Sequence, residues 1–243
     1  MELKPIRTDN KDFRGNYAAT TQAQDYAAPA DSAQRVLRNT YLLLALTMVP
    51  TVIGAAIGIQ LAPVMMASPI LTVVLMLGSV IGLQFAIARY RNSAIGVVLL
   101  LLMTGLVGLF LGPLLNVALS MRNGVQLVGY AAVGTGAIFM VMGAIATTTK
   151  RDFSFMGKFL FVGMIALLVA MLANMFLQIP ALALTISTLV IVVFSLFLLY
   201  DLNRIVRGGE TNYVMATTGV YLSLLNIFSS LLHLLMALTG DRD

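Results

Sequence analysis

The sequence contains no cysteine and no tryptophan, and histidine occurs once among its 243 residues. The lack of cysteine excludes disulfide bonds, a thiol nucleophile and a thiolate metal site. Without tryptophan, tyrosine has to supply the aromatic side chains that anchor helices at a membrane surface. Charged residues are scarce as well, at 10% of the chain, whereas a soluble domain carries about 25%. These shortages argue against an ordinary soluble domain.

Hydrophobic residues make up 59% of the chain, and the mean hydropathy is +0.93. This composition is typical of a protein that crosses the lipid bilayer several times. The net charge of +5 does not indicate a nucleic-acid partner, because such a surface needs basic residues clustered on a soluble face. Here lysine and arginine stand between hydrophobic segments, and we interpret them as determinants of membrane orientation.

Seven hydrophobic segments are long enough, at 1.5 Å per residue, to cross a hydrocarbon core of ~30 Å. We place them at residues 39–61, 70–88, 94–115, 125–147, 157–177, 181–200 and 214–238. Gly112-Pro113 is expected to end the third segment, and Pro180 to separate the fifth from the sixth. The sequence therefore predicts an all-α membrane protein with a seven-helix transmembrane domain over residues 39–243.

Residues 1–38, which begin at Met1 and end at Arg38, are polar and carry six basic and five acidic side chains. Such a segment cannot bury enough apolar surface to offset the entropy of ordering. The first hydrophobic run also begins too far from the N-terminus to be the apolar core of a cleavable signal peptide. We expect a disordered cytoplasmic tail followed by a retained first helix.

Thirteen of the fifteen lysine and arginine residues fall in this tail and in alternate connections between segments. The opposite side holds only Arg122 and Arg242. Positive charge is retained on the cytoplasmic side, so we expect a cytoplasmic N-terminus and a C-terminus across the membrane.

Small residues recur at helical spacing within the hydrophobic segments. Three G-x-x-x-G pairs are typical of helix packing in lipid, where close backbone approach replaces the hydrophobic driving force. They are Gly54/Gly58, Gly78/Gly82 and Gly108/Gly112. We expect packing surfaces rather than ligand loops.

The sequence shows no pattern of catalytic residues. Intramembrane hydrolysis needs paired aspartates, a Ser/His pair or H-E-x-x-H, and we recognise none. His233 follows Ser223 by ten residues, about 15 Å along a helix, and is expected to be an interfacial or packed side chain. The methionines are scattered without the clustering of a copper site. We expect no enzyme, no cofactor and no metal site.

Asp201 directly follows the sixth hydrophobic segment, so we expect it at the cytoplasmic edge of the bundle. An acid that faces the bundle interior there needs a partner. Arg204 is three residues away, and Arg89 or Arg91 belongs to a neighbouring cytoplasmic connection. Two interpretations stay open, a solvated carboxylate paired with Arg204 and a functional acid.

The seventh segment carries Tyr221, Ser223 and Asn226, of which the last two share a helix face. A membrane helix tolerates such groups where they face protein or water, which indicates a central helix. The gating or proton-sensing candidates are therefore Asp201, Ser223, Arg204, Arg89, Arg91 and Asn226.

Several short motifs follow one another in a specific order after the tail. They are Arg38-Asn39-Thr40-Tyr41, Gly112-Pro113-x-Leu115-Asn116, Thr135 to Phe139, Asp152-x-Ser154-Phe155, Asn174-x-Phe176-Leu177-Gln178-x-Pro180-Ala181, Gly208-Gly209-Glu210-Thr211-Asn212-Tyr213 and Tyr221-x-Ser223-Leu224-x-Asn226-Ile227-Phe228. In order and spacing they resemble the Bax inhibitor-1 family of seven-helix membrane proteins, in particular its bacterial YccA-like branch. The resemblance implies a multi-pass inner-membrane protein whose seventh helix is surrounded by the other six.

Family members resemble pH-sensitive calcium leak channels governed by two aspartates. The resemblance maps the first aspartate onto Asp201 and the second onto Ser223. Two carboxylates in one site hinder each other's ionisation and can act as a proton-sensitive latch, whereas a carboxylate that faces a hydroxyl lacks this repulsion between like charges. Calcium also prefers six to eight oxygen ligands, so one acid is a weak site. A proton-linked switch that uses Asp201 alone stays open, so a calcium or proton leak gated at Asp201 is the alternative hypothesis.

The YccA-like branch is associated with FtsH, a membrane-anchored ATP-dependent protease. The resemblance therefore implies a non-enzymatic regulator that associates with an FtsH-type protease complex and modulates it. The tail from Met1 to Arg38 is the expected contact, because such a protease engages an unstructured segment while a packed bundle resists extraction. This regulator is the leading hypothesis from the sequence.

Overall fold

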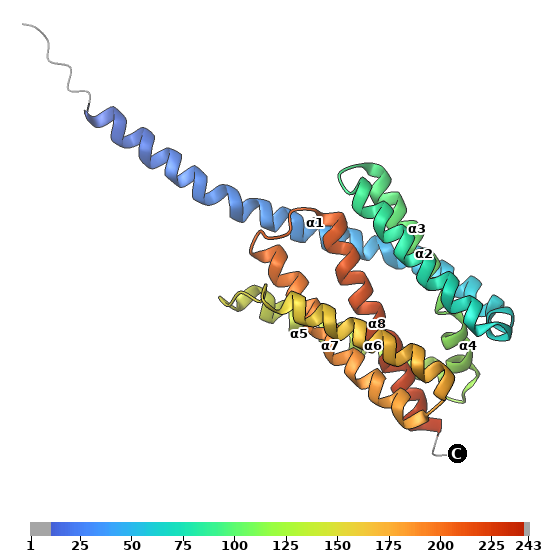
Figure 1. Cartoon of the computed structure of the whole chain (residues 1–243). Coiled ribbons are helices and arrows are strands. Elements are labelled where there is room, and N and C mark those ends of the chain that lie inside the picture. The colour runs from blue at the N-terminus through green and yellow to red at the C-terminus, as the bar shows by residue number, and fades with distance from the viewer. Residues whose placement is uncertain (1–10, 241–243) are drawn as a thin grey trace, which may run out of the picture.

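The structure is a computed structural model of the whole chain, of which residues 11–240 are described, with side chains from residue 32 onward. Every regular element in this part of the chain is a helix (Figure 1). The helices are α1 (Lys11–Ala67), α2 (Pro69–Tyr90), α3 (Ala94–Phe110), α4 (Gly112–Ser120), α5 (Gly124–Thr148), α6 (Met156–Leu177), α7 (Pro180–Val206) and α8 (Tyr213–Gly240). Seven helical spans among them are long and apolar enough to cross a membrane, which confirms the predicted fold class.

The third span is longer than predicted, because Gly112-Pro113 does not end it. The chain turns at Leu111 and continues as α4 to Ser120, so α3 and α4 form one span, Ala94–Ser120. Proline has no N–H and would break a helix interior, but it fits the first turn of a new helix. Pro113 occupies that position in α4 and bends the span instead of ending it.

The sixth span is also longer, since α7 continues past Tyr200 to Val206. Asp201 therefore lies within the helix and not after it. Arg204 in the last turn interacts favourably with the negative end of the helix dipole. The helix ends where Gly208 adopts a left-handed conformation with φ 74°, a backbone geometry that glycine accepts without steric cost.

The first span begins before the predicted boundary at residue 39. Residues 1–10 lie outside the described part of the chain, and α1 is helical from Lys11, whereas the composition predicts disorder up to Arg38. Alanine-rich sequence favours helix, and a helix already formed in the membrane extends without a new nucleation cost. Ala33 is buried, and Val36 and Leu37 pack against the core, so the bundle includes these residues.

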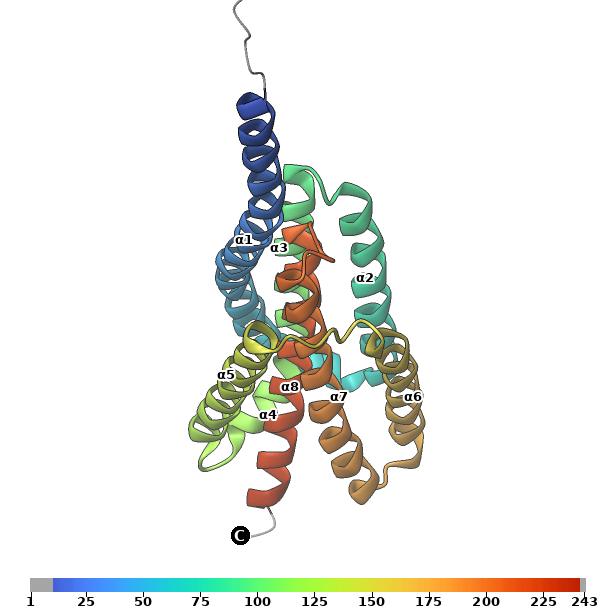
Figure 2. The same ribbon diagram turned by 90° about the vertical axis from the view of Figure 1, so that its left-hand side faces the viewer.

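Helix α8 occupies the centre of the bundle (Figure 2). It packs against α1, α2, α3, α4, α5 and α7, whereas α6 packs only against α7. The seventh span is therefore surrounded by five of the other six. Tyr221 of α8 is 1% exposed, and its hydroxyl lies 2.9 Å from Thr51 Oγ1 of α1 and 3.2 Å from the Thr104 carbonyl of α3. Its polar group faces protein, as a central membrane helix requires.

Glycines bring α1 against the span formed by α3 and α4. A Cβ added to Gly54 would lie 2.0 Å from the carbonyl oxygen of Gly105, and one on Gly58 would lie 2.1 Å from that of Leu109. The predicted packing role is confirmed for this pair and for Gly108 and Gly112, which face α1. It is wrong for the pair on α2, Gly78 and Gly82, because a Cβ there meets no described atom within 4 Å.

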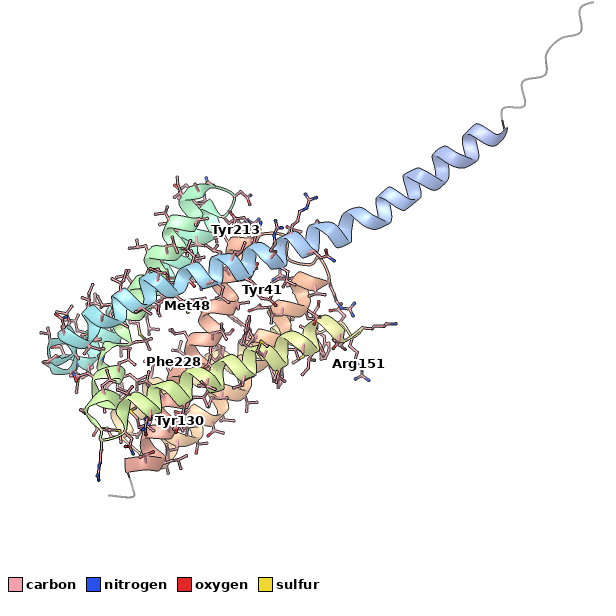
Figure 3. The ribbon with its side chains drawn as sticks, turned by 180° about the vertical axis from the view of Figure 1, so that it is seen from behind. Tyr41, Met48, Tyr130, Arg151, Tyr213 and Phe228 are labelled. Carbon is pink, nitrogen blue, oxygen red and sulfur yellow. The ribbon has the colours of Figure 1, made fainter. Side chains whose placement is uncertain are left out.

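Three connections meet at one end of the bundle, called here the Asp201 end. Asn212, before α8, donates from Nδ2 to the Arg91 carbonyl at 2.9 Å and to Asn92 Oδ1 at 2.8 Å. Arg207, after α7, donates to the Lys150 carbonyl. The connections α2–α3, α5–α6 and α7–α8 are thereby tied together. The opposite end, where α8 stops, is called the Gly240 end. In Figure 3, Arg151, which follows α5, marks the Asp201 end, and Tyr130, near the start of α5, lies toward the Gly240 end.

Candidate functional site

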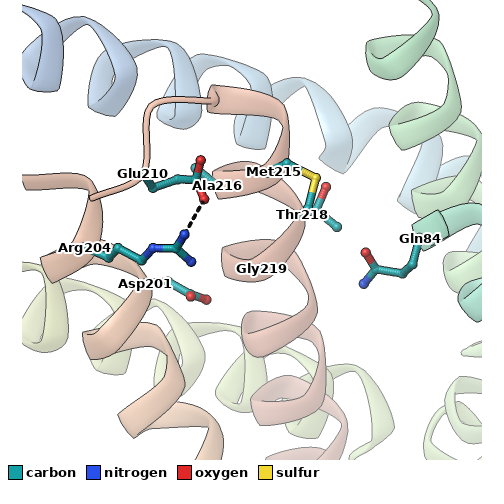
Figure 4. A pocket seen from close by; sticks show the side chains of 8 residues that line it. All are labelled: Gln84, Asp201, Arg204, Glu210, Met215, Ala216, Thr218 and Gly219. Atoms are coloured by element: carbon teal, nitrogen blue, oxygen red, sulfur yellow. Dashed lines mark ion pairs between the residues drawn. The ribbon is translucent and has the colours of Figure 1, made fainter. Parts of the chain in front are cut away.

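A cavity of about 200 Å³ lies near the Asp201 end, between α2, α7 and α8 (Figure 4). Its walls carry one acidic and one basic side chain from α7, a second acidic side chain from the α7–α8 connection, and a glutamine side chain from α2. The lining residues are Gln84, Asp201, Arg204, Glu210, Met215, Ala216, Thr218 and Gly219. Two of the six candidates from the sequence, Asp201 and Arg204, therefore share one cavity.

The carboxylate of Asp201 faces α8 at Gly219. A Cβ added to Gly219 would lie 2.7 Å from Asp201 Oδ2 and 3.2 Å from Cγ, so a larger residue there would displace the carboxylate from this position. Ser223 stands four residues further along α8 and is 3% exposed, but it does not line the cavity. The structure thus places the acid opposite a glycine, one helical turn from the predicted serine.

Arg204 forms its ion pair with Glu210 and not with Asp201. Its Nη2 lies 3.3 Å from Glu210 Oε2, and the two side chains are 43% and 17% exposed. Arg204 Nε also donates to the Gly209 carbonyl at 3.3 Å, and Glu210 Oε1 accepts from the Asn212 backbone N–H at 3.0 Å. The pairing of Asp201 with Arg204, one of the two interpretations that the sequence left open, is not formed, and Arg204 instead pairs with Glu210 at the end of α7.

Glu210 is a site residue that the sequence reasoning missed. A usable signal was present, because Gly208-Gly209 stands between the end of α7 and this acid, and a glycine in the left-handed conformation turns the chain back. Residues 32–240 contain only three acids, and two of them, Asp201 and Glu210, line the same cavity.

Gln84 of α2 was also missed. It stands within an otherwise apolar stretch of the helix, and Figure 4 shows its amide pointing across the cavity toward α8. A polar group in a membrane helix is costly unless it faces protein or water. This rule, applied to α2 as it was applied to the seventh segment, would have identified the residue.

The other candidates lie elsewhere. Arg89 is exposed in the last turn of α2, and Arg91 contributes its backbone carbonyl to the bond with Asn212. Asn226 donates from Nδ2 to the Leu222 carbonyl of its own helix at 2.8 Å and does not line the cavity. Arg89 and Arg91 therefore make no ion pair with Asp201 in the described structure.

The cavity holds two carboxylates and one guanidinium. When all three groups are ionised they carry a net charge of −1, which favours a proton or a cation over an anion. The described residues contain no cluster of three or more His, Cys, Asp or Glu side chains that would hold a metal ion.

The expectation that the chain has no Ser/His pair is wrong for the folded structure. Ser187 of α7 and His233 of α8 are 46 residues apart, yet Ser187 Oγ lies 3.0 Å from His233 Nδ1. Sequence spacing could not reveal a pair made by two antiparallel helices. Ser187 also donates to the Ala183 carbonyl at 2.9 Å, which is the behaviour of a packed membrane serine and not of an activated nucleophile.

Comparison with known proteins decides the family. Residues 33–240 match the family model described as inhibitor of apoptosis-promoting Bax1. The chain belongs to the Bax inhibitor-1 family. The modulator of FtsH protease YccA from Escherichia coli K12 is 41% identical over 204 residues, which cover 84% of this chain and 90% of that protein.

Two further relatives show how widely this Bax inhibitor-1 sequence is shared among bacteria. An uncharacterized membrane protein of Vibrio cholerae is 43% identical over 205 residues, covering 83% of this chain and 88% of that protein. A protein of Neisseria meningitidis is 38% identical over 220 residues, covering 89% and 97%. The YccA of another Escherichia coli strain is named an inner membrane protein. This Bax inhibitor-1 protein is accordingly a multi-pass inner-membrane protein.

Proposed function

We propose that this protein is a non-enzymatic inner-membrane regulator that binds an FtsH-type protease and modulates its activity. The observation that carries the proposal is the 41% identity with the Escherichia coli protein named modulator of FtsH protease. The match extends over nearly the whole bundle, so it concerns the architecture and not one local motif.

The proposed contact is the N-terminal segment together with the Asp201 end of the bundle. Helix α1 projects beyond the other helices at this end (Figure 1). Thirteen of the fifteen lysine and arginine residues stand in the N-terminal segment, in the connections at this end or in the helix turns next to them, and the positive-inside rule assigns them to the cytoplasm. A protease that pulls on cytoplasmic segments would therefore meet the projecting helix first, while the packed bundle resists extraction.

Deleting residues 1–31 tests this contact and leaves Ala33, Val36 and Leu37 in the core. We expect the truncated protein to lose co-purification with the protease and to lose its effect on the turnover of a membrane substrate. The matched control replaces residues 1–31 with a scrambled segment of the same composition. If the truncated protein binds and modulates like the full chain, the N-terminal segment is not the contact.

The second candidate function is a pH-sensitive calcium or cation leak gated at Asp201. The specific observation in its favour is that Asp201 and Glu210 line one cavity between three helices, which supplies a second carboxylate where Ser223 does not. The protein in liposomes with an enclosed calcium dye, at about pH 6 and about pH 8, distinguishes the two functions. Asp201→Asn should abolish pH-dependent flux, and Asp152→Asn in the exposed α5–α6 connection is the control. If liposomes with the wild type and with Asp201→Asn are equally impermeable to calcium at both pH values, the leak is excluded.

A further inference from the structure

A second cavity, of about 330 Å³, lies toward the Gly240 end and is lined by residues of α4, α6, α7 and α8. Its size is within the range of small-molecule sites, about 300–1,000 Å³. One part of its wall is apolar, and the other part is polar without an acidic side chain. The lining residues are Leu114, Met171, Ala183, Ile186, Asn174, Ser187, Ser229, Ser230 and His233.

The imidazole of His233 is held by Ser187, whose side chain is 6% exposed. Ser187 Oγ is 3.0 Å from Nδ1 and 2.9 Å from the Ala183 carbonyl. A hydroxyl has one hydrogen, so when Ser187 donates to the carbonyl it accepts from Nδ1–H. Either direction of the Ser187–His233 bond leaves Nε2 as the ring nitrogen that can meet a ligand.

Asn174 offers a second donor whose orientation is fixed. Its Oδ1 accepts from the Ile179 backbone N–H at 3.1 Å, at the turn where Gln178 has φ 52°. Because a backbone N–H requires an acceptor, the amide cannot be flipped, and the nitrogen takes the other position. No bond from Asn174 Nδ2 to another described residue is present, so its two hydrogens are available to a ligand.

The charges around this cavity favour an anion. Residues 32–240 contain three acids, Asp152, Asp201 and Glu210, and all three belong to the Asp201 end. The lining residues from α4, α6 and α7 are uncharged, and the connection α4–α5 at the Gly240 end carries Arg122. Asp241 and Asp243 follow α8 outside the described residues. A cation would thus find no carboxylate in the wall, whereas a protonated His233 and an amide N–H attract a carboxylate.

We propose that the cavity at the Gly240 end binds the carboxylate of a small or amphiphilic organic acid. His233 Nε2 and Asn174 Nδ2 donate to the carboxylate, Ser187 positions the imidazole through Nδ1, and the apolar wall receives the carbon chain. The acid comes either from the lipid, as a fatty acid, or from solution as a short-chain acid. This site is separate from the Asp201 cavity and does not depend on the protease contact.

The test uses His233 as its own reporter, because it is the only histidine in the sequence. The full chain is purified with a histidine-free affinity tag, placed in lipid nanodiscs and labelled with ¹³C-histidine. Octanoate, octanol and acetate are titrated separately while the single imidazole resonance is followed. Octanoate should shift it saturably, because a protonated imidazole donates from Nε2 to the carboxylate.

The three probes separate the sources of the acid. A shift with octanoate alone supports an amphiphilic acid, and a shift with acetate as well supports a general carboxylate site. Equal shifts with octanol and octanoate overturn the proposal, because apolar partitioning would then explain both. No saturable shift with any probe also overturns it.

Asn174→Asp is the decisive variant. It keeps the Oδ1 acceptor for Ile179, removes the N–H donors and adds a negative charge, so octanoate affinity should fall by more than about tenfold. Ser187→Ala should weaken binding, because the ring loses its positioning bond. Gln84→Leu, which removes an amide from the other cavity, is the control and should bind octanoate like the wild type. Unchanged affinity in Asn174→Asp would refute the assignment.

Discussion

The carboxylate of Asp201 lies against Gly219, so that a methyl group added at Gly219 would be 2.7 Å from Oδ2. This contact joins the last turns of α7 to the first turns of α8 inside a cavity that Arg204 and Glu210 also line. The Asp201 carboxylate can occupy this position because Gly219 on α8 has no side chain. A substitution at Gly219 therefore changes the position of the carboxylate directly.

Gly219→Ala should displace the Asp201 side chain while costing only about 1 kcal/mol of stability, because the atom it meets is the end of a rotatable side chain. If the cavity is functional, this variant should impair protease modulation or ion flux as strongly as Asp201→Asn. Thermal unfolding in detergent together with either assay measures both effects. Normal function in Gly219→Ala would show that the position of the carboxylate does not matter.

Gly54→Ala should be much more damaging than Gly78→Ala. The added carbon at Gly54 would lie 2.0 Å from the Gly105 backbone oxygen, so α1 and α3 must separate, at a cost of about 1–3 kcal/mol or more. At Gly78 nothing lies within 4 Å, and alanine should be neutral or stabilise by up to about 1 kcal/mol through helix propensity. Unfolding of the two variants under identical conditions measures the difference, and equal stability would contradict the packing.

Arg204→Gln should destabilise the protein more than Glu210→Gln does. Removing the guanidinium leaves two carboxylates, Asp201 and Glu210, at one cavity, whereas removing Glu210 leaves one acid and one base. The ion pair itself contributes only about 0.2–1 kcal/mol because Arg204 is partly solvated. A double-mutant cycle at low and high salt gives the coupling. The reverse order of stabilities would mean that the two acids do not repel each other.

Tyr221→Phe should cost about 1–2 kcal/mol, because the buried hydroxyl contacts both Thr51 and the Thr104 carbonyl. Thr51 keeps a second partner, since its hydroxyl also donates to the Thr47 carbonyl at 2.7 Å, so the loss stays moderate. Tyr130→Phe on the exposed face of α5 is the control and should leave stability unchanged. A loss as small as that of the control would rule out a bridging role for the Tyr221 hydroxyl.

Asp152, in the connection between α5 and α6, should titrate below the usual range of an aspartate. The hydroxyl and the backbone N–H of Ser154 donate to its Oδ1 at 2.6 Å and 2.8 Å, and these bonds lower the pKa of Asp152. Because the folded pKa is depressed, the bonds stabilise the connection above the unfolded pKa of about 4. That contribution is lost as the pH falls through the folded value.

Ser154→Ala should raise the pKa of Asp152 toward the ordinary value by removing the hydroxyl donor while keeping the N–H. Carboxyl ¹³C resonances followed through an acid titration measure the change. Ser93→Ala, in another connection of the Asp201 end, removes a hydroxyl that donates to the Tyr90 carbonyl and serves as the control. If the pKa of Asp152 does not change in Ser154→Ala, the hydrogen bond from the Ser154 backbone N–H, and not the one from its hydroxyl, lowers that pKa.

The sequence predicted the membrane class and the seven spans well, because both depend on local hydrophobicity. It predicted the ends of spans less well. Pro113 bends a span where the pattern predicted an end, and α7 continues through Asp201 because helix hydrogen bonding does not stop at a charge. Gly54 and Gly78 have identical local motifs, and only the fold shows that the first packs while the second faces outward.

By itself, then, the sequence determined a seven-span membrane protein of the Bax inhibitor-1 family and singled out Asp201 as an acid at the end of a span. The tertiary structure alone decided the partners of that acid, because a partner depends on which helix lies opposite and in what register. Gly219, and not the expected Ser223, faces the Asp201 carboxylate. Glu210 forms an ion pair with Arg204, and the Ser187 hydroxyl lies within hydrogen-bond distance of His233. Those contacts join residues on different helices, which hydrophobicity and spacing along one chain do not encode.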